Sequence, residues 1–273
     1  MINPVTIIAA IYTLYLYYLR SFMNTPLPHD TIVPQKGSSL SKKQQVAAMF
    51  DRIAHRYDFL NHFLSIGIDR IWRKKAIRQL KAIKPRFLLD VATGTGDLAV
   101  MAAKILQPEK IIGIDISKGM LELGKDKIAR LSLSGKIELL EGDSETINFP
   151  DNTFDAVTVA FGVRNFENLH KGLQEMLRVL KPGGKLVILE FSRPRHKAFK
   201  GLYDMYMNQV APGVGKLVSK DPDAYQYLND SVQAFPEGKA LLTILKQTGY
   251  TDTYLKTLSL GICTIYCGQK EHS

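Results

Sequence analysis

The stretch Leu88–Asp97 (LLDVATGTGD) carries the strongest structural signal in the chain. An apolar run ends in a carboxylate, two glycines follow, and a helical pattern begins, which predicts a strand, a tight turn and a helix. Gly94 and Gly96 permit backbone conformations that side chains disfavour, and they leave room for a ligand against the main chain. Because nucleotide-binding dehydrogenases share the Gly-x-Gly pattern, this pattern alone does not separate function classes.

The carboxylates around this turn narrow the choice of ligand. Asp90 ends the expected strand and Asp97 begins the expected helix, where a dinucleotide fold places a phosphate. Asp115 follows the second expected strand, at the position that accepts hydrogen bonds from ribose hydroxyls. Asp143 follows the third, where it can reach an adenine edge. Taken together, the four acids favour S-adenosylmethionine (SAM), which is cationic, carries an adenosine and lacks phosphate.

The rest of the chain alternates between short apolar runs and helical patterns, which is typical of a parallel sheet covered on both faces. We expect strands at residues 87–91, 111–114, 137–140, 156–161 and 186–189, and helices at 97–106, 120–131, 169–180 and 237–248. Two further strands, 254–260 and 262–267, are separated only by Gly261, so they must pair antiparallel or bend. On the last strand, Cys263 and Cys267 share one face and are expected in the core.

Composition bounds the function classes. The chain has 273 residues, 45% of them hydrophobic, and a net charge of +10, which excludes a disordered protein. Two cysteines are too few for a disulfide framework. The sequence also lacks a cluster of Cys and His residues that would indicate a structural metal. We expect a globular, intracellular protein.

The N-terminal region, 1–40, is interpreted as an apolar extension and a flexible linker, ahead of a catalytic domain at 41–273. Residues 1–19 carry no charge, which permits a short membrane anchor, an interfacial segment, or sequence upstream of a start at Met23. The last interpretation is preferred. Residues 24–41 are rich in proline and polar residues, as linkers are.

Two helices are expected next, one capped by Ser41 and one from Asp69 to the residue before Pro85. The second presents Trp72 on its buried face and a basic run on the other. That run comprises Arg70, Arg73, Lys74, Lys75, Arg78, Lys81, Lys84 and Arg86. It suits nucleic acid, anionic lipid or an anionic ligand, or it is a solvated helix face. A long insertion at 190–235 is interpreted as a substrate cap or a surface loop.

Three segments resemble the UbiE-type C-methyltransferases of ubiquinone and menaquinone biosynthesis, over about 85% of the chain. They are 57–65 (YDFLNHFLS), followed by Trp72; 161–165 (FGVRN); and 178–192 (RVLKPGGKLVILEFS). The first segment departs from the family pattern at Leu60, where Met is usual, and beyond it at Asp69, where His is usual.

The resemblance implies a class I SAM-dependent methyltransferase fold, a Rossmann-like seven-stranded sheet with its last strand antiparallel. It also implies SAM as co-substrate without a metal, held by contacts at Thr95, Asp115, Asp143 and Ser144. Ala160 stands where the family often has a serine, so no contact is expected there.

The implied reaction methylates a ring carbon of a polyprenyl quinol, either demethylmenaquinol or a polyprenyl methoxybenzoquinol. Because a phenol ionises near pH ~10, a base or a positively charged side chain must favour its ionised form at neutral pH. Arg164 is the candidate that stabilises the phenolate, with Asn165 orienting it, and Asp58 or Asp143 accepting the proton. Tyr57 and Asp58 are expected to fold over the site. The alternatives are a surface ion pair for Arg164 and a core aromatic for Tyr57.

The implied partners follow from the substrate. A polyprenyl quinol resides in the bilayer, so the basic run is expected to contact anionic lipid at the cytoplasmic face of the membrane. Homodimers are common in the family. Nucleic acid is not expected, because FGVRN replaces the Asn-Pro-Pro-Tyr-like loop or catalytic cysteine of base methylases. A methyltransferase acting on RNA or another small molecule, and a non-catalytic SAM-binding module, remain the alternatives.

Overall fold

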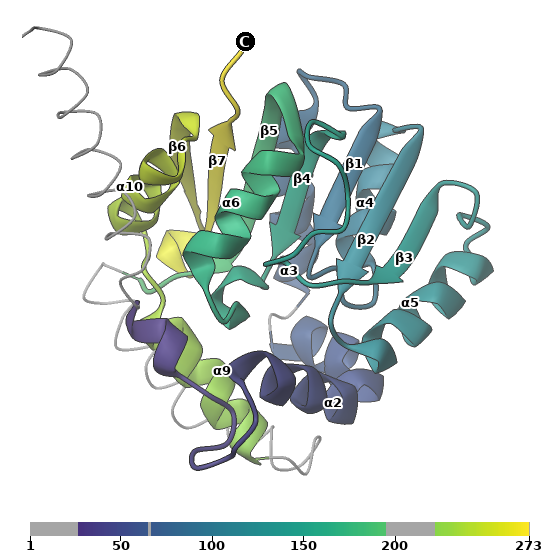
Figure 1. Ribbon diagram of the computed structural model, residues 1–273. Helices are drawn as coiled ribbons and strands as arrows, with labels where there is room; N and C mark the ends of the chain where they lie inside the picture. Colours follow the sequence, from purple (N-terminus) through teal and green to yellow (C-terminus); the bar gives the residue numbers. More distant parts are fainter. Residues whose placement is uncertain (1–26, 65–66, 195–221, 273) are drawn as a thin grey trace, which may run out of the picture.

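The computed structural model describes residues 27–64, 67–194 and 222–272, and within these ranges the side chains of 56–64, 222, 223 and 225 are left out (Figure 1). Its centre is a seven-stranded sheet in the order β3-β2-β1-β4-β5-β7-β6. The strands are β1 Phe87–Val91, β2 Lys110–Asp115, β3 Ile137–Glu141, β4 Phe154–Ala160, β5 Leu180–Phe191, β6 Thr251–Leu258 and β7 Cys263–Gln269.

The first five strands pair in parallel, whereas β7 runs antiparallel to both β5 and β6. The predicted fold class is therefore confirmed. The helices and 3-10 turns are η1 Pro28–Thr31, α2 Lys42–Leu64, α3 Ile68–Ile77, η2 Arg78–Leu80, α4 Asp97–Leu106, α5 Lys118–Arg130, η3 Val163–Asn165, α6 Leu169–Val179, α9 Pro222–Ala234, α10 Lys239–Thr248 and η5 Ser259–Gly261.

The sheet is buried on both faces, as its continuous apolar strands require. Leu88 and Ile111 pack with α3, α4 and α5 on one face, and Leu89 and Val157 pack with α6 and α10 on the other. Cys263 and Cys267 are buried together in the first of these clusters, as predicted. A third cluster joins α2, α9 and Met120 of α5 beneath the carboxyl ends of the strands (Figure 1).

Several element boundaries differ from the sequence prediction for local reasons. β5 begins at Leu180, six residues before the expected start, because Leu180 already pairs with Phe154 across a register shift. The helix expected from Asp69 to the residue before Pro85 is regular only to Ile77 and then tightens into η2. The link between the last two strands is η5 and not Gly261 alone.

The prediction of a flexible linker does not hold for residues 27–41. His29 is fully buried, its ring meets the edge of Phe235 at 5.3 Å, and its carbonyl accepts a hydrogen bond from Lys42 Nζ at 2.6 Å. The predicted helix cap is confirmed: Ser41 Oγ accepts from the Gln44 amide, and Gln44 Oε1 accepts from the Ser41 amide. Residues 1–26 lie outside the described residues.

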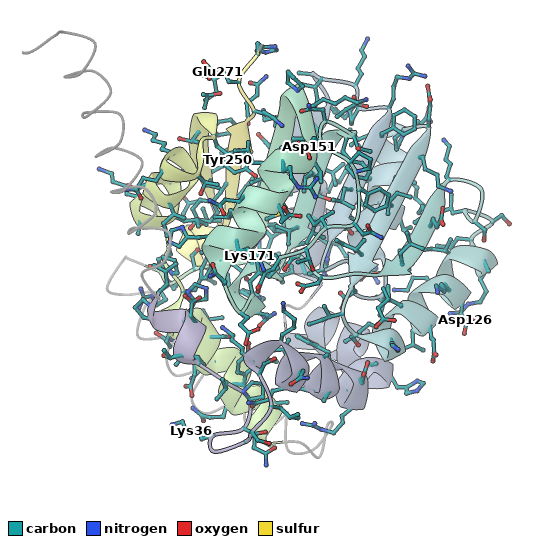
Figure 2. All side chains as sticks on the ribbon, viewed as in Figure 1. Lys36, Asp126, Asp151, Lys171, Tyr250 and Glu271 are labelled. Atoms are coloured by element: carbon teal, nitrogen blue, oxygen red, sulfur yellow. The ribbon has the colours of Figure 1, made fainter. Side chains whose placement is uncertain are left out.

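Within the described ranges, no helix combines the length and apolar character needed to cross a bilayer. The C-terminus lies at the opposite end of the sheet from α2 and α9 (Figure 1). Figure 2 shows this polarity in the labelled side chains, with Lys36 at the α2 end and Asp151 and Glu271 at the other.

Candidate active site

A cleft, partly open to solvent, lies where the carboxyl ends of the parallel strands meet α2 and α3. Its wall includes the glycine turn after β1, the residues that follow β2, β3 and β4, and the first turns of α2. The switch in strand order between β1 and β4 opens such a crevice, which is where open parallel sheets bind ligands.

The glycine turn provides the space that the sequence predicted. Gly94 and Gly96 adopt φ values of +57° and +80°, in the left-handed region that side chains disfavour. A Cβ built on Gly94 would meet no atom within 4 Å, so this backbone faces open cleft. Gly96 precedes the first residue of α4, so the cleft receives the amino end of that helix. A ligand can therefore lie directly against the main chain.

Asp115 is fixed in the cleft by backbone contacts. Its Oδ2 accepts the Gly94 amide at 2.8 Å, and its Oδ1 accepts the Ser117 amide at 2.9 Å. Burial raises the pKa of Asp115, although these amides oppose the shift. The carboxylate is thus held rigidly at the end of β2, as a ribose-binding acid requires.

Two of the predicted acids face lysines. Asp143 and Glu145 both contact Lys43 Nζ from α2, and Asp97 contacts Lys127 Nζ at 2.7 Å. The expectation that four carboxylates form one negative rim is therefore corrected, because the packing of α2 and α5 neutralises part of it. Thr95 and Ser144 also line the cleft, and their contact with SAM stays a prediction.

Asp90 lies behind the cleft surface. It is 1% exposed and accepts hydrogen bonds from Thr93 Oγ1 and Thr158 Oγ1, both at 2.6 Å. Burial raises the pKa of Asp90 to about 6, although the two hydroxyls and the charge of Arg73 oppose the shift. The structure thus gives Asp90 a support role under the turn, and its direct contact with a ligand stays a prediction.

The two residues predicted from FGVRN occupy different environments. Asn165 lines the cleft, and its Oδ1 accepts a hydrogen bond from Tyr227 of α9 at 3.1 Å. Arg164 is 3% exposed and donates to Glu190 Oε1 and to the Phe161 carbonyl, both at 2.6 Å. Arg164 is thus in an ion pair, as the alternative interpretation held, but the pair is buried and not on the surface. Arg164 is not part of the cleft wall.

The other two predicted catalytic residues, Tyr57 and Asp58, belong to α2, but their side chains lie outside the described part of the chain. Their position over the site stays a prediction. The first turns of the same helix supply Lys43, Val46 and Phe50 to the cleft wall.

Sequence reasoning missed several cleft residues. Arg73 was assigned to the exposed basic run, yet it is buried in the cleft wall, whereas the rest of that run is exposed. Phe50 and Met120 looked like ordinary core positions of amphipathic helices. Ile116 carried a usable signal, because it directly follows Asp115 at the end of a strand.

Comparison with known proteins identifies the family. The model of the ubiE/COQ5 methyltransferase family matches residues 38–270. The chain belongs to the ubiE/COQ5 methyltransferase family. It is accordingly a methyltransferase, and the expectation from the resemblance is confirmed.

The alignments with curated relatives cover nearly the whole length of those proteins. A demethylmenaquinone methyltransferase of Bacteroides fragilis is 48% identical over 89% of this chain and 99% of its own. One from Porphyromonas gingivalis is 43% identical over 89% and 97%. A ubiquinone/menaquinone biosynthesis C-methyltransferase UbiE of Geobacter sulfurreducens is 46% identical over 84% and 90%.

Solved structures share the fold at low identity. A SAM-dependent methyltransferase from Thermotoga maritima superposes with a TM-score of 0.57 at 18% identity, covering 82% of this chain and 99% of its own. An O-methyltransferase family protein from Burkholderia thailandensis gives 0.59 at 15% identity, covering 81% and 62%. These similarities support the class I methyltransferase fold.

SAM is the co-substrate that this family implies, and the residues present fit it. The open main chain at Gly94 can take the amino-acid portion, and Asp115 can accept two hydroxyls. Asp143 and Ser144 line the same cleft, where their adenine contact stays a prediction, and Ile116 and Met120 add apolar surface. Among the described residues, no group of His, Cys, Asp or Glu is arranged to hold a metal ion.

Proposed function

We propose that this ubiE/COQ5 family member methylates a ring carbon of a polyprenyl quinol with SAM, and that demethylmenaquinol is its principal substrate. The similarity of 48% over nearly the whole length of the Bacteroides fragilis enzyme carries the proposal. The ubiquinone/menaquinone relatives keep a polyprenyl methoxybenzoquinol as the second candidate. The cleft supports this assignment, because it joins a SAM-type turn to an apolar and aromatic wall.

SAM supplies a methyl group on a positively charged sulfur; an in-line displacement forms the new carbon–carbon bond while the sulfur keeps the electron pair. The accepting ring carbon is nucleophilic when its neighbouring hydroxyl has lost its proton. After transfer, that carbon loses its own hydrogen as a proton, and the ring becomes aromatic again. The chain's task is to align the two reactants and to favour the ionised ring.

Asn165 is the predicted catalytic residue that the structure brings to the cleft, so we assign it the orientation of a ring oxygen or a water. Its Oδ1 is held by Tyr227, which leaves the amide fixed in the cleft wall. Arg164 and Glu190 lie behind it and are assigned to hold η3 in place. Tyr57 and Asp58 keep the proposed roles of closing the site and accepting a proton, with Asp143 as the alternative acceptor.

A direct assay tests the proposal. Purified protein is incubated anaerobically with SAM and a short-chain demethylmenaquinol, and the methylated product is measured by mass spectrometry. We expect one methyl group on the ring carbon, and no product when SAM is omitted. A parallel reaction with the methoxybenzoquinol decides between the two rings. Failure to methylate either quinol would contradict the proposal.

The alternative functions predict different results in simple measurements. A non-catalytic SAM-binding module would be thermally stabilised by SAM without forming product. A methyltransferase of RNA or another small molecule would leave both quinols unmethylated. A dehydrogenase would be stabilised by NAD and not by SAM.

We also propose that the protein contacts an anionic membrane surface from the cytoplasmic side. Three apolar side chains gather near α3: Ile68 is 38% exposed, Ile71 52% and Leu260 63%. The hydrogen bond from Trp72 Nε1 to Ser259 Oγ, at 2.9 Å, holds α3 against η5, which carries Leu260. Exposed basic residues lie on the same helix as Ile68 and Ile71: Arg70, Lys74 and Lys75. Together they form the combination that interfacial binding needs.

Vesicle sedimentation tests this contact. Binding is expected to vesicles that contain phosphatidylglycerol, to weaken with salt, and to be absent from pure phosphatidylcholine. Ile71→Ser should weaken binding, whereas Leu131→Ser, which also removes an exposed apolar side chain but lies outside α3 and η5, should not. Binding that is indifferent to lipid charge and to Ile71→Ser would contradict the proposal.

A further inference from the structure

The cleft wall, within the described residues, carries two basic side chains in very different electrostatic settings. Lys43 contacts the two carboxylates of Asp143 and Glu145. These contacts raise the pKa of Lys43 more than burial lowers it, so its charge is well compensated. Arg73 is the other; its guanidinium lies over the Phe161 ring, and Asp69 and Asp90 are acids in its neighbourhood.

Arg73 is a buried charge with weak compensation. It lies on α3 and is 8% exposed. Among the described residues, it forms an ion pair with Asp69 Oδ2, 3.5 Å from Nε, and Nε has no hydrogen-bond acceptor. Its charge also acts on the buried carboxylate of Asp90. A buried guanidinium ordinarily makes bidentate or otherwise close contacts, because leaving it without them is costly. The arrangement is therefore ready for an anionic partner in the cleft.

Aromatic rings hold the guanidinium in the wall. The Arg73 Cζ atom lies over the Phe161 ring at 5.2 Å, and Phe161 stacks on Phe191 with ring centres 4.5 Å apart. Trp72 meets the edge of Phe191 at 6.2 Å. Phe161 has a φ of +59°, unusual for a side-chain-bearing residue, so the packing holds its ring in this place. The guanidinium is thus positioned beside a flat apolar surface that suits an aromatic ring.

We propose that Arg73 binds the ring oxygen next to the methylated carbon and stabilises its ionised form; this inference rests on the proposed quinol substrate. A guanidinium stays protonated, so Arg73 supplies charge and donors and is not the base. The phenolic proton goes to the acceptor proposed above or to water from the open side of the cleft. Electrons from the oxygen then enter the ring as the carbon bonds to the methyl group. Arg164 is the less suitable cation, because Glu190 compensates it behind the wall.

The first test measures the ionisation of a bound phenol without any turnover. The probe is 4-nitro-1-naphthol, whose visible absorption separates phenol from phenolate, bound to the protein with S-adenosylhomocysteine. The wild-type protein should lower the pKa of the bound probe relative to the free probe, and Arg73→Gln should restore it. Arg73→Lys should give an intermediate value. An unchanged pKa in the wild-type protein would overturn the inference, whatever the folding of the variants.

The second test uses the reaction itself. With short-chain demethylmenaquinol, Arg73→Gln should lower kcat about 100-fold, as loss of a charged donor does. The kcat of the wild-type enzyme should rise with pH as the bound phenol ionises, and in Arg73→Gln this rise should occur at higher pH. The affinity for SAM should stay within twofold, because Arg73 is not among the glycine-turn contacts. Arg130→Gln, an exposed change of equal charge on α5, is the control and should leave kcat unchanged.

The outcomes separate this inference from the proposed function. If the wild-type enzyme methylates no quinol, the function is wrong. If it does, and Arg73→Gln keeps the wild-type kcat and pH profile, only the role of Arg73 is wrong. If Arg73→Gln does not fold, Arg73→Lys and the wild-type probe titration still decide.

Discussion

The two halves of the cleft are built in opposite ways. The acid half, formed by Gly94, Gly96, Asp97, Asp115 and Asp143, consists of residues at or shortly after the carboxyl ends of β1, β2 and β3. The arginine wall, in which Arg73 and Phe161 line the cleft and Arg164, Phe191 and Glu190 lie behind them, is assembled from α3, η3, β5 and the exit of β4. One half is a repeated local motif, and the other exists only after distant segments have packed.

Their charges differ in the same way. In the acid half, Lys127 and Asp97 each keep 23% side-chain exposure, so water screens their attraction. In the arginine wall, the Arg164 and Glu190 side chains are 4% and 0% exposed, so neither charge has water as a substitute partner. From this comparison we expect changes in the acid half to alter ligand affinity, and changes in the buried pair of the arginine wall to alter stability.

The largest expected effect comes from breaking the buried pair. Arg164→Met leaves the Glu190 carboxylate without its cation, so the free energy of unfolding should fall by about 3–5 kcal/mol. Urea denaturation monitored by circular dichroism measures the change.

The double variant Arg164→Met/Glu190→Gln is the matched control, because it removes both charges. It should recover part of the lost free energy of unfolding, because the side chain at position 190 is then neutral. In the wild-type protein, burial raises the pKa of Glu190, and the contact with Arg164 opposes that shift. Should the single variant lose less than 1 kcal/mol, the two halves of the cleft would not differ as described.

The second effect concerns ligand affinity in the acid half. Asp115→Ala removes the acceptor for the Gly94 and Ser117 amides and the acceptor that we predict for the ribose hydroxyls of SAM. SAM should bind nearly 100-fold more weakly, about 2.5 kcal/mol, because hydrogen bonds to a charged group are lost. Calorimetry gives the dissociation constant.

Asp126→Ala, on the exposed side of α5 (Figure 2), changes the net charge equally and should leave SAM affinity unchanged. Equal losses in both variants would mean that overall charge, and not the fixed carboxylate of Asp115, governs binding in the acid half.

The smallest effect concerns the attachment of α2, which brings Lys43 to the acid half. Burial, together with the charges of Lys42 and His170, lowers the pKa of His29 to about 3. Between pH 6.5 and 3 the unfolded chain therefore binds a proton at His29 that the folded chain does not. The free energy of unfolding is therefore unaffected by His29 protonation above pH 6.5 and falls as the pH is lowered, by about 2 kcal/mol at pH 5.

His29→Leu should remove this dependence while keeping an apolar contact with Phe235. The measurement compares urea unfolding of both proteins at pH 7 and pH 5, where the difference between them should shrink by about 2 kcal/mol. His55→Leu, an exposed histidine on α2, is the control and should follow the wild-type protein. A constant difference at both pH values would contradict the assignment.

The sequence was informative wherever function and local structure share one short segment. The helix predicted at 97–106 matches α4, and the strand predicted at 87–91 matches β1. Asp115 and Ser144 were found because the carboxyl ends of parallel strands must meet at one edge of the sheet. The antiparallel pair at the end was predicted because no crossover fits between its strands.

The sequence was least informative where a side chain's role depends on distant partners. Arg73 looks like its basic neighbours on α3, and only the packing of Phe161 and Phe191 from two other segments places it in the cleft. Arg164 looked like an accessible cation until β5 brought Glu190 beside it. Residues 27–41 looked like a linker because Phe235, which covers His29, lies far along the chain.

The sequence by itself determined the succession of strands and helices, the glycine turn and the acids at the strand ends. Each of these depends on backbone geometry within a few residues. The tertiary structure alone decided which charges are compensated and which face the cleft. Compensation depends on distances of a few ångströms between segments far apart in the chain, and burial makes the consequence large.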